Sequence, residues 1–447
     1  MTVRQHRIFT ALVLAGVLVR IGAALFTTNS QDVALFGYIA TQGAQGHTLY
    51  GDPEFSYPPL VGFIMLAAGK LLAILGLPIV VHAAPLSPFA VPGLVTADLA
   101  TPFASLLIKL PAMLGDAALA LAVDRACRLA GARETARRIA VIFVWLNPLI
   151  IFDSSVQASW DCIVPLSIIA AGMAALDGEG SASGAWIAIG ALAKIVPVTF
   201  IPLAAAALWR AGSGVWRLAS AIGAGAIVAA VALGPIAASG ELPALRDLVA
   251  GRSAAAGFGG FNAWTSLHAY VFAQAAAWMA IHGPTVATVA SVVQFVAVVV
   301  TAVALLRVTP LTIERFVIAA TAVLAVILVT APYVQPGYVV WLAPFCAILG
   351  ACGKPRWNAL LWLASGCALA FMLTVRAPAA LAVPACWFFH LCDPLAFVRA
   401  GYAYAYESGT LTPLAQVDNG MIVGIAGTFV FLLVVWCALA EWRKANA

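Results

Sequence analysis

Long apolar runs recur from one end of this chain to the other, and they constrain its fold more than any other feature. Runs at 8–26, 106–123, 218–237, 286–306 and 421–439 approach the roughly 20 apolar residues with which a helix crosses a bilayer. Only 9 % of the residues are charged, against about a quarter in soluble proteins. The sequence therefore predicts an all-α, polytopic membrane protein. It excludes a disordered chain, a nucleic-acid-binding protein and a soluble enzyme with a grafted anchor.

Basic residues set the expected orientation, because Lys and Arg collect in cytoplasmic loops. The N-terminal Arg4 and Arg7 precede the first run, which lacks a cleavage site and is expected to be a retained span. Counting runs between basic loops predicts about twelve spans with both termini in the cytoplasm. The strongest cluster, expected to be cytoplasmic, is Arg125, Arg128, Arg133, Arg137 and Arg138.

This orientation makes 27–105 a large first extracytoplasmic loop. Within it, the apolar stretch 60–81 is expected to be interfacial, re-entrant or half of a pair of crossings. No soluble domain follows, so residues 1–447 form one expected domain, with the plasma membrane of a bacterium as the expected location. Cys386 and Cys392 fall in an outer segment, where they are either free or paired.

Asp32 directly follows the end of the first span. A carboxylate held at the membrane surface by a rigid helix can take a proton from an attacking hydroxyl, as a general base does. A helix cap is the alternative.

Further polar and aromatic residues crowd the outer side. Tyr57 precedes two prolines that mark the return of the loop to an apolar helix, as a rigid turn with or without ligand contact. The other candidates for substrate contact in the first loop are Tyr38, His47 and Tyr50.

Charges inside apolar runs are functional hypotheses, because each costs several kcal/mol unless it is paired or hydrated. Arg20 and Lys109 lie in expected spans, and Lys194 lies where Pro197 favours a break between two short helices. These cations can hold an anionic group such as a phosphate. The alternative is snorkelling, or pairing with Asp116 or Asp161.

Two outer turns supply further candidates. After Asn147-Pro148, Gln157 and Asp161 either line the same cavity as Asp32 or, in the case of Asp161, cap the next helix. The second turn offers aromatic and amide side chains that form either a site or an interfacial belt, namely Tyr333, Gln335 and Tyr338.

Several motifs are missing from the sequence. It has no phosphate-cradling Gly-x-x-x-x-Gly-Lys loop, no His-Glu-x-x-His, no Gly-x-Ser-x-Gly elbow and no metal-ligand spacing of cysteines. These absences argue against soluble nucleotide chemistry. No cofactor is expected besides the donor substrate, and the sequence leaves a metal requirement open. One loop aspartate is not a coordination set.

In order along the chain, these features resemble the GT-C superfamily of integral-membrane glycosyltransferases, in particular the polyprenol-phosphate-mannose-dependent mannosyltransferases of glycosyltransferase family 87. One departure is Gln335-Pro336-Gly337, where the family pattern often carries a His. The resemblance covers nearly the whole chain and rests on Asp32, Gly46 to Tyr50, Tyr57 to Leu60, Lys109 to Asp116, Asn147-Pro148 with Gln157 to Asp161, Lys194 to Pro197 with Pro202, and Tyr338 to Pro344.

The resemblance implies a catalytic role for Asp32, which would deprotonate an acceptor hydroxyl in an inverting displacement. The donor would be a sugar, mannose first, on a polyprenyl phosphate, and the acceptor a lipid or glycan at the extracytoplasmic face. The departing phosphate would be neutralised by Lys194, with Arg20, Lys109 or Arg376. The rival hypothesis is a transporter or a flippase of lipid-linked sugars, which predicts charges near the bilayer midplane.

Overall fold

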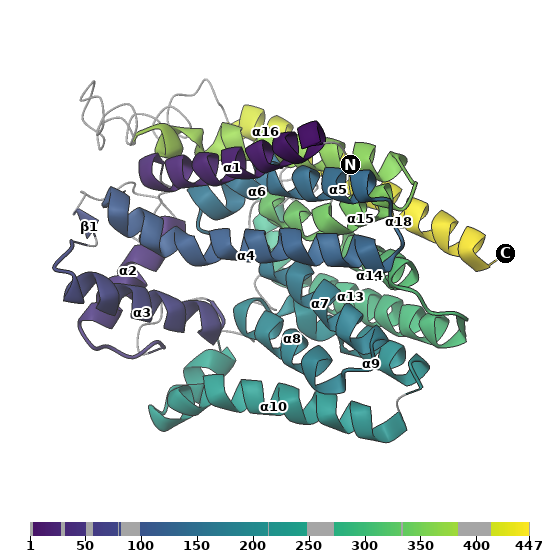
Figure 1. Ribbon diagram of the computed structural model, residues 1–447. Coiled ribbons are helices and arrows are strands. Elements are labelled where there is room, and N and C mark those ends of the chain that lie inside the picture. Colours follow the sequence, from purple (N-terminus) through teal and green to yellow (C-terminus); the bar gives the residue numbers. More distant parts are fainter. Residues whose placement is uncertain are drawn as a thin grey trace.

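The computed structural model describes residues 3–27, 32–50, 57–78, 80–81, 99–212, 214–247, 272–331, 334–382 and 413–446. This part of the chain is almost entirely helical (Figure 1). The exception is an antiparallel pair of two-residue strands, β1 (Val80–Val81) and β2 (Leu99–Ala100). The expectation of an all-α fold is confirmed.

Six described helices contain a segment that is long and apolar enough to cross a membrane, and a seventh crossing arises if one bent pair counts as a single span. The chain is therefore a multi-pass membrane protein. The expected count of about twelve spans stays a prediction. The six are α1 (Val3–Phe26), α4 (Pro102–Leu129), α10 (Gly214–Ala238), α13 (Phe272–Arg307), α14 (Ile313–Thr330) and α18 (Pro413–Asn446).

The bent pair joins α5 (Glu134–Trp145) to α6 (Pro148–Ile151) and the π-helix η1 (Phe152–Val156), with a 41° bend. Pro148 has no N–H to continue α5, and the side chain of Asn147 accepts hydrogen bonds from the backbone N–H groups of Leu149 and Ile150. Asn147 therefore caps the start of the new helix.

The remaining helices are shorter or end near the described limits. Within the stretch 60–81, the chain forms the 16-residue helix α3 up to Ile74, which packs on α2, and the strand β1 at Val80–Val81. The set comprises α2 (Asp32–Ala44), α3 (Pro59–Ile74), α7 (Ile163–Leu176), α8 (Gly180–Ala193), the 3₁₀ turn η2 (Val196–Phe200), α9 (Ile201–Arg210), the 3₁₀ turn η3 (Pro336–Trp341), α15 (Ala343–Ala351) and α16 (Arg356–Ala382).

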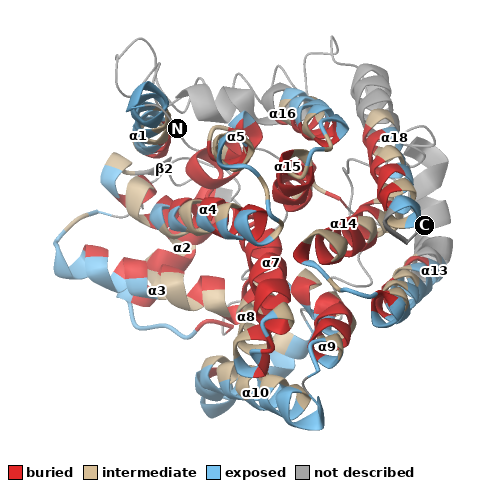
Figure 2. Cartoon of the chain, turned by 45° about the vertical axis from the view of Figure 1, so that its right-hand side comes forward, coloured by how far each residue is buried: buried red, intermediate tan, exposed pale blue. Residues whose placement is uncertain are grey.

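Burial separates a central helix from peripheral ones (Figure 2). Every residue of α7 from Ile163 to Ala175 is buried, as expected for a helix that is apolar all round. By contrast, α10 exposes large apolar side chains such as Ile222 and Val231, which are 74 % and 73 % exposed. An apolar exposed face of this kind suits contact with lipid.

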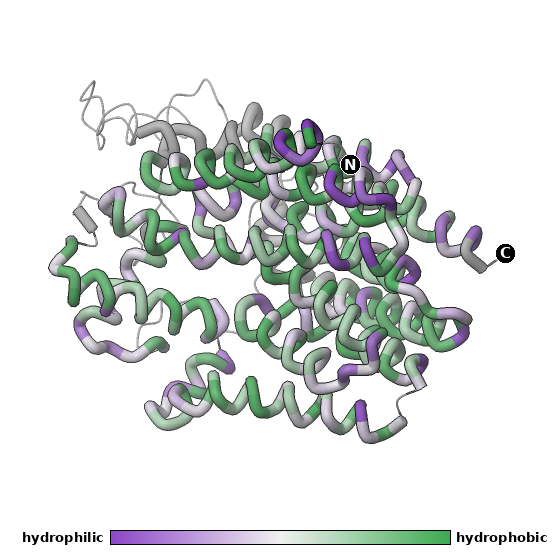
Figure 3. Tube along the Cα trace, viewed as in Figure 1, coloured by the Kyte–Doolittle hydropathy of each residue, from purple (hydrophilic) through white to green (hydrophobic). Residues whose placement is uncertain are grey.

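Both termini and the arginine cluster lie at one end of the helices (Figure 1). Arg138 contacts His6 near the N-terminus at 3.5 Å, and Arg356 pairs with Glu441 near the C-terminus. Hydrophilic residues gather at this end, while hydrophobic residues fill the middle of the helices (Figure 3). We refer to it as the arginine end, and to the other as the loop end.

Small residues allow α8 and α10 to approach closely. A Cβ atom at Gly180 would lie 2.1 Å from the backbone oxygen of Arg217, and one at Gly184 would lie 1.9 Å from that of Ala221. The spacing Gly180-x-x-x-Gly184 is the small-residue pattern with which membrane helices bring their backbones together.

Candidate functional site

Lys194 stands at the break between α8 and η2, at the loop end. The helix ends at Ala193, and Lys194 is extended, with φ −148° and ψ 131°. Pro197 explains this, because its missing N–H would otherwise bond to the carbonyl of Ala193, with which its ring would also clash. The break expected from the sequence is confirmed, and it frees the lysine side chain from the surface of a helix.

Asp161 is the ionic partner of Lys194, with 3.0 Å between Oδ1 and Nζ. The same oxygen accepts a hydrogen bond from the indole N–H of Trp341 at 2.9 Å, and Oδ2 accepts one from the hydroxyl of Ser159 at 2.7 Å. Asp161 is 1 % exposed. Its carboxylate therefore holds Lys194, and no side chain caps α7, so the capping interpretation of Asp161 is wrong.

Two tyrosine rings complete the surroundings of the ammonium group. The Lys194 nitrogen lies 5.6 Å from the ring centroid of Tyr57 and 5.3 Å from that of Tyr338, within the range of cation–π attraction. Tyr338 also stacks on Trp341, with centroids 4.2 Å apart and planes 16° apart. The structure thus brings together four residues that the sequence singled out, from four separate segments of the chain, and we call Tyr57, Asp161, Lys194 and Tyr338 the Lys194 cluster.

The start of α2 lies on the same side. Tyr57 contacts Phe36, with ring centroids 5.1 Å apart. Asp32 is the first residue of α2, about one helical turn before Phe36. The backbone of the proposed base is thereby placed within a turn of a residue that touches the Lys194 cluster.

A second buried carboxylate, which sequence reasoning missed, adjoins Asp161. Asp153 belongs to the π-helix η1 and is 2 % exposed. A Cβ atom on Gly337 would lie 2.7 Å from Oδ1 of Asp153 and 3.4 Å from Oδ2 of Asp161. Both carboxylates therefore face the glycine of the Gln335-Pro336-Gly337 turn. A π-helix often marks a functional site, but this one leaves no distinct sequence pattern.

Arg20 and Asp116 form a separate buried pair. The guanidinium Nε lies 3.0 Å from Oδ2 of Asp116, and the cation lies 3.9 Å from the ring centroid of Trp145. Ser154 donates to the same carboxylate oxygen at 2.6 Å. The sequence offered Arg20 as a ligand for a phosphate, or as a residue that snorkels or pairs with an aspartate. The structure shows the pairing with Asp116.

Lys109 binds the end of α1. Its ammonium donates to the carbonyl oxygens of Ala24 at 3.3 Å and Thr27 at 2.6 Å, and the hydroxyl of Ser105 also bonds to Ala24. These carbonyls lack partners within their own helix. Lys109 therefore caps α1, and its described partners do not include the Lys194 cluster.

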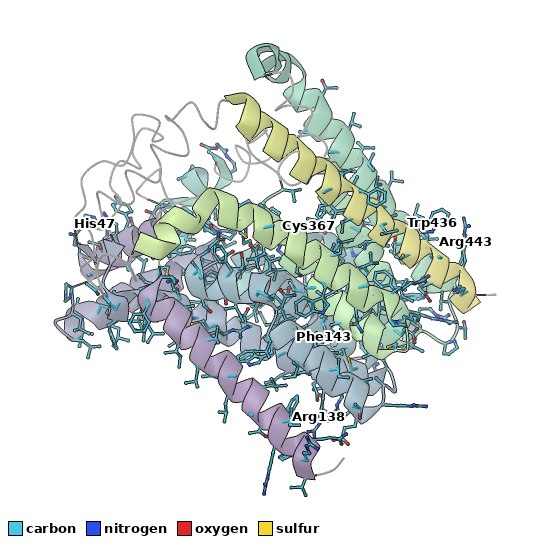
Figure 4. All side chains as sticks on the ribbon, turned by 90° about the horizontal axis from the view of Figure 1, so that it is seen from above. His47, Arg138, Phe143, Cys367, Trp436 and Arg443 are labelled. Carbon is cyan, nitrogen blue, oxygen red and sulfur yellow. The ribbon has the colours of Figure 1, made fainter. Side chains whose placement is uncertain are left out.

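The other candidates are dispersed. His47 is exposed and lies far from Arg138 and Arg443, at the loop end (Figure 4). Gln157 is buried, and its amide nitrogen has no hydrogen-bonding partner among the described residues. Tyr38 and Gln335 are half-buried.

Several expected features lie outside what the structure describes. They are the side chains of Asp32 and Arg376, the whole of Tyr333, and both Cys386 and Cys392.

An apolar cavity of about 620 Å³ opens between α8, α9 and α10. Its lining is almost wholly aliphatic and includes Ala191, Leu192 and Val198, which lie on either side of Lys194 in the sequence. The cavity runs along apolar faces of these helices, and Lys194 itself is not among its lining residues. Within the described ranges, no group of three His, Cys, Asp or Glu side chains could hold a metal ion.

Comparison with protein-family models found no match, and comparison with curated proteins found none either.

Proposed function

We propose that this protein is a membrane glycosyltransferase that moves a sugar, mannose in the first instance, from a polyprenyl-phosphate donor to a lipid or glycan acceptor. The observation that carries the proposal is the Lys194 cluster, which holds a largely buried cation at the end of α8, a helix that also lines an apolar cavity. A polyprenyl-phosphate sugar carries an anionic phosphate between a long apolar tail and a polar sugar. The cation of the Lys194 cluster suits the phosphate, and the apolar cavity suits the tail.

The phosphate would bind at the Lys194 cluster. An ammonium group has three N–H donors, and among the described residues Asp161 is its one ion-pair partner. The side chain is 14 % exposed, so its other donors can reach a ligand. Low dielectric around the buried cluster strengthens attraction between the cation and a phosphate, and the tail would lie in the cavity between α8, α9 and α10.

The transfer itself would be a single displacement. Asp32 would take the proton of an acceptor hydroxyl, whose oxygen forms a bond to the anomeric carbon as the bond from that carbon to the phosphate oxygen breaks. The phosphate leaves with the electron pair, and Lys194 stabilises its charge. The product has the opposite anomeric configuration.

The positive-inside rule places the arginine end in the cytoplasm. In this orientation both termini are cytoplasmic, the chain crosses the membrane about twelve times, and the Lys194 cluster faces the extracytoplasmic side. The donor then reaches the site through the lipid, which agrees with the absence of a nucleotide-binding loop.

The test is transfer of labelled mannose from undecaprenyl-phosphate mannose to extracted membrane lipids and glycans in proteoliposomes. We expect wild-type protein to form a labelled product, and Asp32→Asn and Lys194→Met each to lower the rate at least about a hundredfold. Wild-type rates in Asp32→Asn would contradict the role of Asp32. Translocation of the donor across sealed vesicles without any product would favour the flippase instead.

A further inference from the structure

Glu241 is a buried carboxylate that the mechanism above does not use. It follows the end of α10 at the loop end and is 9 % exposed. Oε2 accepts a hydrogen bond from the hydroxyl of Ser239 at 3.0 Å. Oε1 is buried and has no hydrogen-bonding partner within the described part of the chain.

Glu241 lies where α10 has ended and a second helical segment, residues 242–247, begins. The N–H of Gly240 bonds to the carbonyl of Ala237 at 3.1 Å, and the N–H of Glu241 bonds to that of Ile236 at 3.0 Å. Gly240 has φ +76°, so the helix ends in the common glycine-terminated form. The N–H of Leu245 bonds to the carbonyl of Glu241 at 3.1 Å, so Glu241 starts the next helical segment, whose partial positive charge favours an acid. Burial of Oε1 without a partner among the described residues nevertheless carries a desolvation cost that Ser239 alone does not offset.

Tyr50 connects Glu241 to the Lys194 cluster. Burial and the charge of Glu241 both raise the pKa of Tyr50, so the phenol stays protonated at neutral pH. Its hydroxyl donates to the backbone carbonyl of Tyr57 at 2.9 Å, and the ring of Tyr57 faces Lys194. Helix α3, which follows Tyr57, contacts both α8 and α10. Tyr50 therefore links Glu241 to the residue that forms one wall of the cluster.

We infer that Oε1 of Glu241 accepts a hydrogen bond from a hydroxyl of the sugar that the donor carries. This assignment rests on the proposed function and adds to it a residue that recognises the polar head. A polyhydroxylated ligand supplies the donor that Oε1 lacks, and a hydrogen bond to an ionised acceptor is stronger than a neutral one. The cost of the unpaired carboxylate in the empty site would then be recovered only when the sugar is bound.

The experiment compares two lipids that differ by the sugar alone, undecaprenyl-phosphate mannose and undecaprenyl phosphate, as ligands of purified protein in nanodiscs. We expect wild-type protein to prefer the mannosylated lipid. Glu241→Ala should weaken its binding about tenfold to a hundredfold and leave the affinity for undecaprenyl phosphate unchanged. Glu241→Gln keeps the shape and an acceptor carbonyl, so its affinity for the mannosylated lipid should lie between those of wild type and Glu241→Ala.

A matched control is Asp247→Asn, because this nearby acid is exposed and pairs with Arg246; it should behave as wild type. If wild-type protein binds neither lipid, the proposed function fails. If wild-type protein binds both lipids and Glu241→Ala keeps the full preference for mannose, the proposed function stands and the assignment of Glu241 fails. Equal weakening of both lipids by Glu241→Gln would also overturn the assignment.

Discussion

Removing the carboxylate of Asp161 should destabilise the protein strongly, and removing Lys194 as well should restore part of the loss. Asp161→Ala deletes an ion pair at 3.0 Å and the acceptor for Trp341 at 2.9 Å. It leaves a largely buried ammonium group without its partner. Breaking a buried pair from one side costs about 3–5 kcal/mol, and we expect the free energy of unfolding to fall by about 4 kcal/mol.

In the double variant Asp161→Ala/Lys194→Met, no charge is left uncompensated, and Met fills the space of the lysine stem. The remaining cost is that the indole N–H of Trp341 and the hydroxyl of Ser159 lose their acceptor, about 1–3 kcal/mol each. The double variant should therefore be more stable than Asp161→Ala alone. The coupling energy between the two sites should exceed about 2 kcal/mol, or about thirtyfold in the unfolding equilibrium.

The assay is equilibrium unfolding in mixed detergent micelles for the two single variants, the double variant and the wild type. The exposed pair Arg246 and Asp247 provides a matched cycle in which coupling should be near zero. If the losses in the two single variants simply add up in the double variant, Lys194 and Asp161 are energetically independent and the description of the cluster is refuted.

Three further substitutions test other parts of the structure. Gly337→Ala places a Cβ atom 2.7 Å from a carboxylate oxygen of Asp153. We expect the rate of mannose transfer to fall at least about tenfold. An unchanged rate would mean that transfer does not depend on the position of this carboxylate. In Gly184→Leu the added side chain collides with the backbone carbonyl of Ala221 and pushes α8 away from α10. We expect the free energy of unfolding to fall by about 1–3 kcal/mol and undecaprenyl phosphate to bind more weakly. Lys109→Met removes the ammonium donor to the carbonyl of Thr27, at a cost of about 1–3 kcal/mol in the same unfolding assay. Lipid affinity should stay at the wild-type value, and a loss of affinity would place Lys109 in the phosphate site.

Residues with a strong local cause were predictable from the sequence. Pro197 ends α8 because of its own covalent structure, so the break at Lys194 follows without any knowledge of the rest of the fold.

Contacts between residues distant in the sequence were harder to predict. The sequence offered Asp116 and Asp161 as partners for its buried cations, and the packing of α1 on α4 assigns Asp116 to Arg20. The same packing gives Lys109 the last carbonyls of α1, a role that depends on where another helix ends. Side-chain type alone could not distinguish a cap from a ligand-binding cation.

Asp153 and Glu241 show a second limit. Each stands among apolar or small residues without a motif, and its importance comes from burial and from neighbours on other elements. For Asp153 the neighbour is Gly337, which lies on η3 and far along the chain. A carboxylate in a polar turn is common, and the close approach of the glycine is visible only in three dimensions.

The position of the donor phosphate tests the central claim most directly. A density map of the protein in nanodiscs with undecaprenyl-phosphate mannose should show a phosphate oxygen about 3 Å from Nζ of Lys194, with the tail between α8 and α10 and the anomeric carbon beside Asp32. A phosphate bound at the arginine end, or one that leaves Lys194 without contact, would contradict the account.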